Sequence, residues 1–183
     1  PQIKTLLSLR KPLYNTPKYI RSFEENENHL ILPRGLKEQI VDFFNINAVD
    51  FSFIDKRYFK QIETKKVTFN LRPEQNDAIK EIKKTDLSIC VAPPGFGKTL
   101  LGAKIFEIRA CSTIIVVNKN MLLNQWIERF VDYFGYEKQD IGYLGKGHNK
   151  LNGSIDVATM QSLKNDPDII NNYSFVIVDE CHH

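Results

Sequence analysis

The sequence predicts an α/β fold, in which a mostly parallel sheet carries helices on its faces, preceded by a small α+β module. Three observations predict it. After residue 66, short apolar runs typical of strands alternate with helical patterns, as crossover connections between parallel strands require. Some runs are apolar at every position, such as Phe175–Val178, which is typical of strands buried on both faces. A glycine-rich loop also separates the apolar run at 87–91 from a helical pattern that opens near Lys98.

Residues 1–66 are expected to form the α+β module. Two short apolar stretches joined by a polar turn indicate a hairpin, and Pro33 ends this pattern. Helical spacing follows, and the aromatic residues beyond it suit further strands. In order, the expected elements are a strand at 18–23, a turn at 24–28, a strand at 29–32, a helix at 36–44 and strands near Phe51, Phe53, Tyr58 and Ile62.

Residues 67–183 are expected to form the α/β domain. Its first helix opens at Pro73, because proline suits a first helical turn, and Ala78, Ile79 and Ile82 share one face. The later elements follow from apolar runs and the helical spacing between them. In order, they are a strand at 87–91, a helix at 98–109, a strand at 113–117, a helix at 121–134 and strands at 141–144, 155–158 and 175–178.

The composition of the 183 residues is that of a globular protein, with 42% hydrophobic and 26% charged residues. No apolar run approaches the length of a membrane span, and the first residues carry no signal-peptide pattern. The chain does not begin with Met, so we expect its natural start to lie upstream. Three scattered cysteines without a C-x-x-C pair indicate reduced thiols in an intracellular protein, cytoplasmic or nucleoid-associated.

Basic residues are concentrated in the first third of the chain. The net charge is +3, and residues 1–66 hold 12 Lys and Arg against 8 Asp and Glu, whereas the rest holds 13 against 14. A basic surface with aromatic residues can bind nucleic acid through phosphates and stacking. Solvated lysines over an ordinary aromatic core explain the same residues, so the role of this part stays open.

The loop Ala92–Thr99 has the composition of a phosphate-binding loop. Between a strand and a helix, such a loop directs backbone N–H groups and a helix N-terminus at one point, which favours a polyphosphate. Lys98 can then reach the β- and γ-phosphates, and the Thr99 hydroxyl can ligate Mg²⁺. Ala92 stands where the usual pattern has its first glycine, and Phe96 is bulky for this loop. The candidate nucleotide-binding residues here are Pro94, Gly95, Phe96, Gly97, Lys98, Thr99 and Leu100.

A second acidic element follows the strand at 175–178. Asp179 lies at the carboxyl end of that strand, where open α/β sheets bind ligands. It can hold the Mg²⁺ through water, and Glu180 can orient or deprotonate an attacking water. Together with the loop, this pair predicts nucleotide hydrolysis. The candidate catalytic residues are Lys98, Asp179 and Glu180, with Thr99 and Asp179 as the metal site.

Other features have plainer interpretations. The G-x-x-G-x-G pattern at 142–147 has no helical pattern after it, so we expect a strand and turn. Three consecutive residues, Cys181 to His183, rarely converge on one metal ion without other ligands. Trp126 is expected to pack in the core, and Gln125 is expected to be a polar residue at the surface without a function.

Five motifs, in order, resemble superfamily 2 helicases and translocases, in the first of their two RecA-like domains. Pro94–Thr99 is similar to motif I and Asp179–His182 to motif II, with Cys181 in place of the Ala of the Asp-Glu-Ala-His form. The other three are Leu71–Gln75, similar to the adenine-reading motif, Ile115–Trp126, similar to motif Ia, and Val157–Leu163, similar to the next strand-end motif. The resemblance implies a RecA-like sheet that binds ATP and Mg²⁺. It also implies a role for each matching residue: Arg72 and Gln75 at the base, Lys119, Asn120, Thr159 and Gln161 on nucleic acid, and His182 in coupling.

The string Asp179–His183 is most similar to the XPB-like and restriction-enzyme branch. This resemblance implies DNA as the partner rather than RNA, and a small N-terminal module that touches it. In this family a second RecA-like domain of the same chain supplies an arginine finger, typically worth ~10³–10⁵ in rate. Since residues 1–183 stop just past motif II, we expect them to turn over ATP poorly by themselves.

The sequence thus predicts part of an ATP-dependent DNA helicase or translocase, without a membrane and of open oligomeric state. One alternative is the motor subunit of a restriction or recombination complex. Another is an ATP-gated DNA-binding module without motor activity. DNA against RNA, polarity and unwinding against duplex translocation are not written in these residues.

Overall fold

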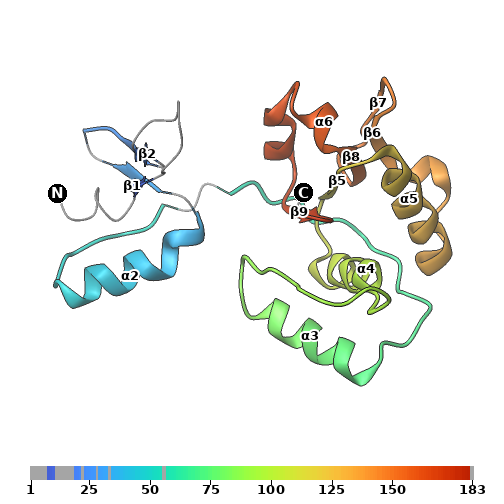
Figure 1. Ribbon diagram of the computed structural model, residues 1–183, viewed down its shortest axis with the longest axis horizontal. Coiled ribbons are helices and arrows are strands. Elements are labelled where there is room, and N and C mark those ends of the chain that lie inside the picture. Colours follow the sequence, from blue (N-terminus) through green and yellow to red (C-terminus); the bar gives the residue numbers. More distant parts are fainter. Residues whose placement is uncertain are drawn as a thin grey trace. The chain divides into compact units, whose positions relative to one another are not determined.

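The computed structural model describes residues 8–10, 19–21, 23–27, 29–32, 34–54 and 57–181 (Figure 1). The chain forms two compact units, Pro1–Ile54 and Asp55–His183. We expected the boundary between the two domains near residue 66, but residues 60–68 hydrogen-bond to the rest of the second unit. Ser112 N donates to Lys60 O at 2.8 Å, and Thr68 N donates to Tyr133 O at 2.9 Å. These bonds explain why the second unit begins earlier than the composition indicates.

In the first unit, the described strands pair in two antiparallel couples. β1 (Ser8–Arg10) pairs with β2 (Tyr19–Arg21), and β3 (Glu24–Glu25) pairs with β4 (Leu30–Ile31). The expected pairing of 18–23 with 29–32 is therefore wrong, because the polar stretch expected as the turn itself supplies a strand. The actual turn is shorter, and Asn26 closes it by accepting from His29 N at its Oδ1, 2.8 Å away.

The rest of the first unit is helical and then irregular. η1 (Arg34–Leu36) leads into α2 (Lys37–Ile46), which confirms the expected helix and buries Ile40. The further strands expected near Phe51, Phe53, Tyr58 and Ile62 do not form, because no neighbouring strand pairs with them in the described residues. Instead, in the first unit, the ring of Phe51 packs against that of Phe44, 4.8 Å between centroids. In the second unit, Gln61 makes an isolated bridge with Cys111.

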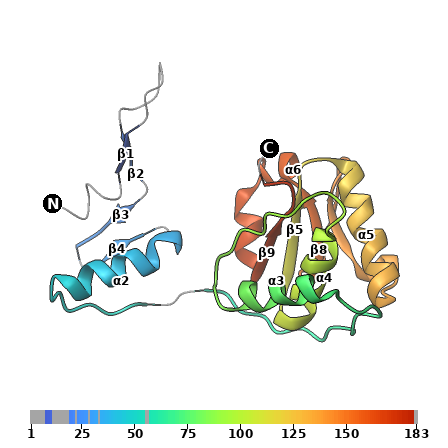
Figure 2. The ribbon, with the colours of Figure 1, turned by 60° about the horizontal axis from the view of Figure 1, so that its bottom comes forward.

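The second unit is built on a five-stranded sheet of order β7-β6-β8-β5-β9. Figure 2 shows β9, β5 and β8 of this sheet. The pairs β6–β8, β8–β5 and β5–β9 are parallel, and β6–β7 is an antiparallel hairpin. The predicted strands at 113–117 and 175–178 are confirmed at both ends. The bounds are β5 (Thr113–Val117), β6 (Gly142–Gly145), β7 (His148–Lys150), β8 (Ile155–Thr159) and β9 (Phe175–Val178). This is the α/β architecture that the alternating pattern predicts.

Helices pack on both faces of this sheet because alternate residues of β5 point to opposite sides. Ile115 and Val117 pack with residues of α4 and α5 in one core cluster. Ile114 and Val116 pack with Leu163 and Tyr173 in another. The helices are α3 (Pro73–Lys83), α4 (Lys98–Arg109), α5 (Asn120–Phe134) and α6 (Met160–Leu163), with 3₁₀ turns η2 (Lys138–Asp140) and η3 (Pro167–Asn172).

The strand predicted at 87–91 does not form. These residues run as a loop between α3 and α4 (Figure 1), and their apolar side chains are exposed: Leu87 by 64%, Ile89 by 78% and Val91 by 91%. Strand propensity reflects packing on a paired, half-buried surface, and it is realised only where a neighbour supplies the ladder. Here β9 is the last strand of the described sheet and pairs with β5 alone. The phosphate-loop residues are therefore held by α3 and α4.

Among the described residues, none of the helices combines the length and the apolar character needed to cross a membrane.

Candidate functional site

The candidate phosphate loop is a tight turn at the start of α4. Gly95 has φ +78° and Gly97 has φ +94°, both in the left-handed region that glycine adopts readily. Phe96 N donates to Pro93 O at 3.2 Å, which closes the turn. Gly97 is doubly constrained, because a Cβ there would lie 2.7 Å from Gln75 Nε2. The loop therefore needs glycine for its backbone and for the close approach of α3.

Lys98 begins α4 and is half-buried. Its Nζ donates to Ala92 O at 3.0 Å, so the ammonium group lies across the mouth of the loop. This contact keeps the cation near the N-terminus of α4, where backbone N–H groups have no partner within the helix. An ammonium group and a helix N-terminus at one point form an environment that favours an anion.

A cleft of about 190 Å³ brings the candidate catalytic residues together. Lys98 and Thr99 line it from the start of α4, and Asp179 and Glu180 line it from the end of β9. These side chains are about 80 residues apart in sequence, and the fold brings the start of α4 and the end of β9 to one cleft. The cleft is completed from α5 by Leu122, Gln125, Trp126 and Arg129.

Those four α5 residues are missing from the sequence-based site. Trp126 is buried in the aromatic core as expected, with 3% of its surface exposed, but it also lines the cleft. Gln125 is exposed, yet it faces the same cleft. Positions 122, 125, 126 and 129 have the spacing of one helix face, which is the signal that could have identified them together.

Asp179 is held at two points. Its backbone N–H donates to Val116 O at 2.9 Å, which continues the β5–β9 ladder past the strand end. Its carboxylate Oδ2 accepts from Trp126 Nε1 at 2.8 Å. Glu180 follows with φ +55°, a left-handed conformation that costs a residue with a side chain ~1–2 kcal/mol. This sharp turn lets two consecutive carboxylates line one cleft.

The donor set of the cleft fits Mg²⁺. Thr99, Asp179 and Glu180 offer oxygen atoms, which are the ligands that Mg²⁺ prefers. Within the described part of the chain, no cluster of three or more His, Cys, Asp or Glu side chains is arranged to hold a metal by itself. Such a sparse set suits a magnesium ion that keeps waters and binds substrate phosphates as well.

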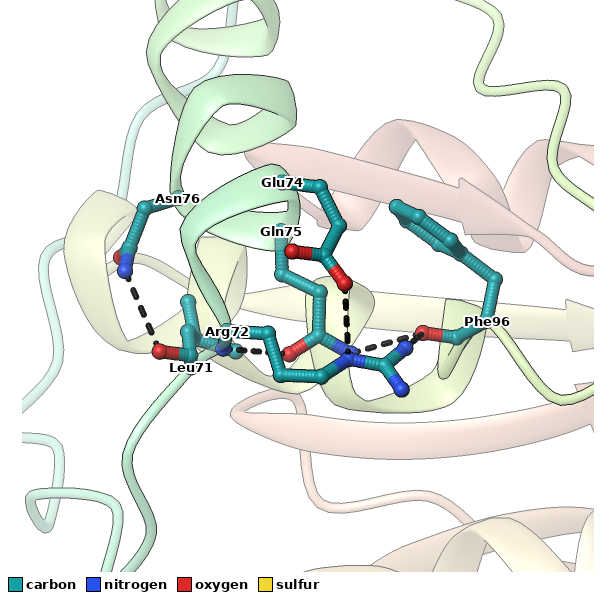
Figure 3. A network of polar contacts seen from close by, with 6 residues as sticks. All are labelled: Leu71, Arg72, Glu74, Gln75, Asn76 and Phe96. Atoms are coloured by element: carbon teal, nitrogen blue, oxygen red, sulfur yellow. Dashed lines mark hydrogen bonds and ion pairs between the residues drawn. The ribbon is translucent and has the colours of Figure 1, made fainter.

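Gln75 lies beneath the loop in a network of polar contacts (Figure 3). Its Oε1 accepts from Arg72 N at 2.9 Å, and its Nε2 donates to Phe96 O at 2.7 Å. Arg72 Nη2 donates to the same carbonyl at 2.8 Å, and the guanidinium lies 5.8 Å from the Phe96 ring centroid. Gln75 is 3% exposed, so its amide is part of the support of the loop.

The candidate nucleic-acid residues lie where β5 and β8 end. Lys119, Asn120 and Gln161 are exposed, whereas Thr159 is buried. The Thr159 hydroxyl accepts from Ser162 N at 3.3 Å and donates to Ser162 Oγ, and so caps α6. Its side chain is therefore engaged inside the protein. His182, the candidate coupling residue, lies outside the described residues.

Comparison with known proteins gives one family and several relatives. Residues 68–183 match the family described as the type III restriction enzyme, res subunit. The chain is 33% identical over 135 residues to the DNA 3'-5' translocase XPB2 of Sulfurisphaera tokodaii, covering 74% of this chain and 29% of that protein. It is 27% identical over 144 residues to the protein named "Probable helicase D10" of Escherichia phage T5, covering 78% and 31%.

The fold also has a counterpart among solved structures. The UvsW helicase from bacteriophage T4 superimposes with a TM-score of 0.71 at 21% sequence identity, covering 99% of this chain and 75% of that one. The two curated relatives above are far longer, since the matched part spans only about 30% of their length. These matches confirm the superfamily 2 resemblance and the RecA-like fold.

Proposed function

Because this chain belongs to the family of the type III restriction enzyme res subunit, we propose that it is the ATP-binding part of an ATP-dependent DNA helicase or translocase. The observation that carries the proposal is the cleft that joins Lys98 and Thr99 to Asp179 and Glu180. One ammonium group, one hydroxyl and two carboxylates around a helix N-terminus suit the triphosphate of ATP with its metal ion.

Each residue of the cleft has a distinct task in this proposal. Lys98 binds the β- and γ-phosphates, and the backbone N–H groups of Gly95, Gly97 and Thr99 are proposed to surround them. Thr99 and Asp179 would hold Mg²⁺, which neutralises charge on the phosphates when bound. Glu180 orients the attacking water and takes up its proton.

We assign Arg72 and Gln75 to the adenine side of the site. The Gln75 amide has two N–H donors and two acceptor lone pairs, and the network uses one of each. One donor and one acceptor remain, which is the pattern that pairs with N7 and N6 of adenine. Because Gln75 is 3% exposed, this role requires that ATP binding expose the free edge of the amide.

Lys119, Asn120 and Gln161, just after β5 and β8, are proposed to contact the DNA backbone. They are exposed at the carboxyl ends of β5 and β8, and lysine and amide side chains are common phosphate ligands. DNA is favoured over RNA because the relative from Sulfurisphaera tokodaii is named a DNA translocase. A second RecA-like domain of the full-length protein would supply the arginine that completes catalysis.

A restriction or recombination motor is the second candidate, and the family description favours it. In that case translocation would feed a nuclease located elsewhere. A binding module without motor activity is the third, and it predicts ATP binding without turnover.

Steady-state ATP hydrolysis by the full-length protein separates a motor from the binding module. It is measured without nucleic acid and then with single-stranded DNA, duplex DNA and RNA in turn. A motor is expected to hydrolyse ATP faster in the presence of the nucleic acid along which it moves. DNA should increase the rate of ATP hydrolysis more than RNA does. Bound ATP with no turnover on any polymer would contradict the motor and favour the binding module.

A further inference from the structure

Trp126 belongs to two parts of the molecule at once. Its ring packs in the aromatic core of α5, with its centroid 6.1 Å from that of Phe130. Its Nε1–H donates to Asp179 Oδ2 at 2.8 Å, inside the cleft. Core packing accounts for the ring, but it does not require that the N–H point at the carboxylate directly after β9.

We propose that Trp126 is a positioning residue, which orients the Asp179 carboxylate for the Mg²⁺–ATP complex. This inference rests on the proposed function of the cleft. It adds a residue on α5 to a site otherwise formed by the loop and by the end of β9.

The indole has little freedom to move. It is 3% exposed, and a Cβ on Gly102 of α4 would lie 2.7 Å from its Cη2 atom. Gly102 thus leaves the room that the ring fills. Because the indole N–H is fixed by the core, it holds the Asp179 carboxylate in one orientation. Hydrogen-bond partners of metal ligands orient those ligands in the same way.

The bond also restricts Asp179 without consuming it. The backbone of Asp179 is fixed by Val116 O, and the indole then fixes the side-chain torsions. A carboxylate has about four lone-pair sites, so acceptor capacity remains for a metal-bound water. A hydrogen bond to an ionised acceptor is also about twice as strong as one between neutral groups, so it can hold this orientation.

The test uses Trp126→Phe, which keeps an aromatic ring and removes the N–H. Binding of a fluorescent ATP analogue is measured at a series of Mg²⁺ concentrations, together with the melting temperature. We expect the Mg²⁺ concentration for half-maximal binding to rise about 10-fold, while binding without Mg²⁺ stays unchanged. Phe130→Leu is the matched control, since it disturbs the same core but leaves the Asp179 bond intact; its Mg²⁺ dependence should be that of the wild type.

An unchanged Mg²⁺ dependence in Trp126→Phe, with the wild type binding normally, would overturn the inference. A lower Mg²⁺ requirement would overturn it too, since the indole would then compete with the metal. If the wild type bound no Mg²⁺–ATP, the proposed function itself would fail, which is a distinct result.

A second measurement does not depend on the folding of Trp126→Phe. Trp126 is the single tryptophan of the 183 residues, so the emission of the chain reports on it alone. We expect Asp179→Ala to change this emission without any ligand, because the indole loses its charged partner. Identical wild-type and variant spectra would contradict the bond on which the inference stands.

Discussion

The side-chain amide of Gln75 joins α3 to the phosphate loop, donating from Nε2 to Phe96 O at 2.7 Å while Oε1 accepts from Arg72 N. Both ends of the amide are thus engaged in a nearly fully buried position. The loop has no paired strand before it in the described residues, so this helix-borne amide is a main support of its geometry.

Gln75→Ala should therefore loosen the loop. It leaves Arg72 N without its acceptor and removes one of the two donors to Phe96 O, which keeps the bond from Arg72 Nη2. A polar group that loses its partner costs about 1–3 kcal/mol. We expect the free energy of unfolding to fall by that amount in urea denaturation, and ATP to bind more weakly. Asn76→Ala is the control, because the Asn76 amide bonds Leu71 O at an exposed site. Equal stability of the two variants would contradict the role of Gln75.

Glu180→Gln in the full-length protein should keep ATP binding and stop hydrolysis. The amide occupies the same space but cannot accept the proton of water, and general-base catalysis is worth about 10²–10⁴ in rate. Single-turnover hydrolysis checks this, with the exposed Glu128→Gln on α5 as the control. Turnover at the wild-type rate would rule out the assigned role.

Lys119→Ala should weaken DNA binding by the full-length protein at all sequences alike. Loss of one phosphate contact should also lower the slope of log K against log salt by about 1. Lys138→Ala, at an exposed position in η2 beyond the other end of α5, is the control. If the two variants showed the same salt slope, the strand-end loops would not be the DNA-binding edge.

Tyr173→Phe should lower the stability of the fold at a position that does not line the cleft. The Tyr173 hydroxyl donates to the fully buried Asp156 carboxylate at 2.7 Å, and hydrogen bonds to charged groups contribute about 1.5–3 kcal/mol. Urea denaturation at neutral pH should show a loss of this size. Tyr133→Phe, at a partly exposed position, should cost far less.

The bond between Tyr173 and Asp156 also predicts how stability depends on pH. Burial, and then the bond to Asp156, raise the pKa of the Tyr173 hydroxyl above its ordinary value. The unfolded chain then releases this proton first, so the contribution of Tyr173 is full below about pH 10 and declines at higher pH. The difference in the free energy of unfolding between wild type and Tyr173→Phe should therefore become smaller as the pH rises above about 10. A difference that stayed constant as the pH rose above 10 would contradict it.

Much of the α/β unit was predictable from the sequence, because β9 is apolar at every position, β5 is apolar at all positions but Thr113, and α4 begins after a glycine. The run at 87–91 is also rich in apolar residues and yet is a loop, since an apolar run does not report whether a neighbouring strand is available. The bond from Trp126 to Asp179 was equally out of reach. Helical spacing places Trp126 in the core, but the partner of its N–H lies 53 residues away and is brought near only by the packing of α5.

The most direct test of the account is calorimetric titration of the chain with ATP and Mg²⁺, comparing wild type with Lys98→Ala. Lys98 is the cation of the cleft that lies at the helix N-terminus, and a lost bond to a charged group should weaken binding at least ~10-fold. Lys80→Ala, on the exposed face of α3, should bind as the wild type does. Equal affinity of wild type and Lys98→Ala would contradict the central claim that this cleft holds the triphosphate.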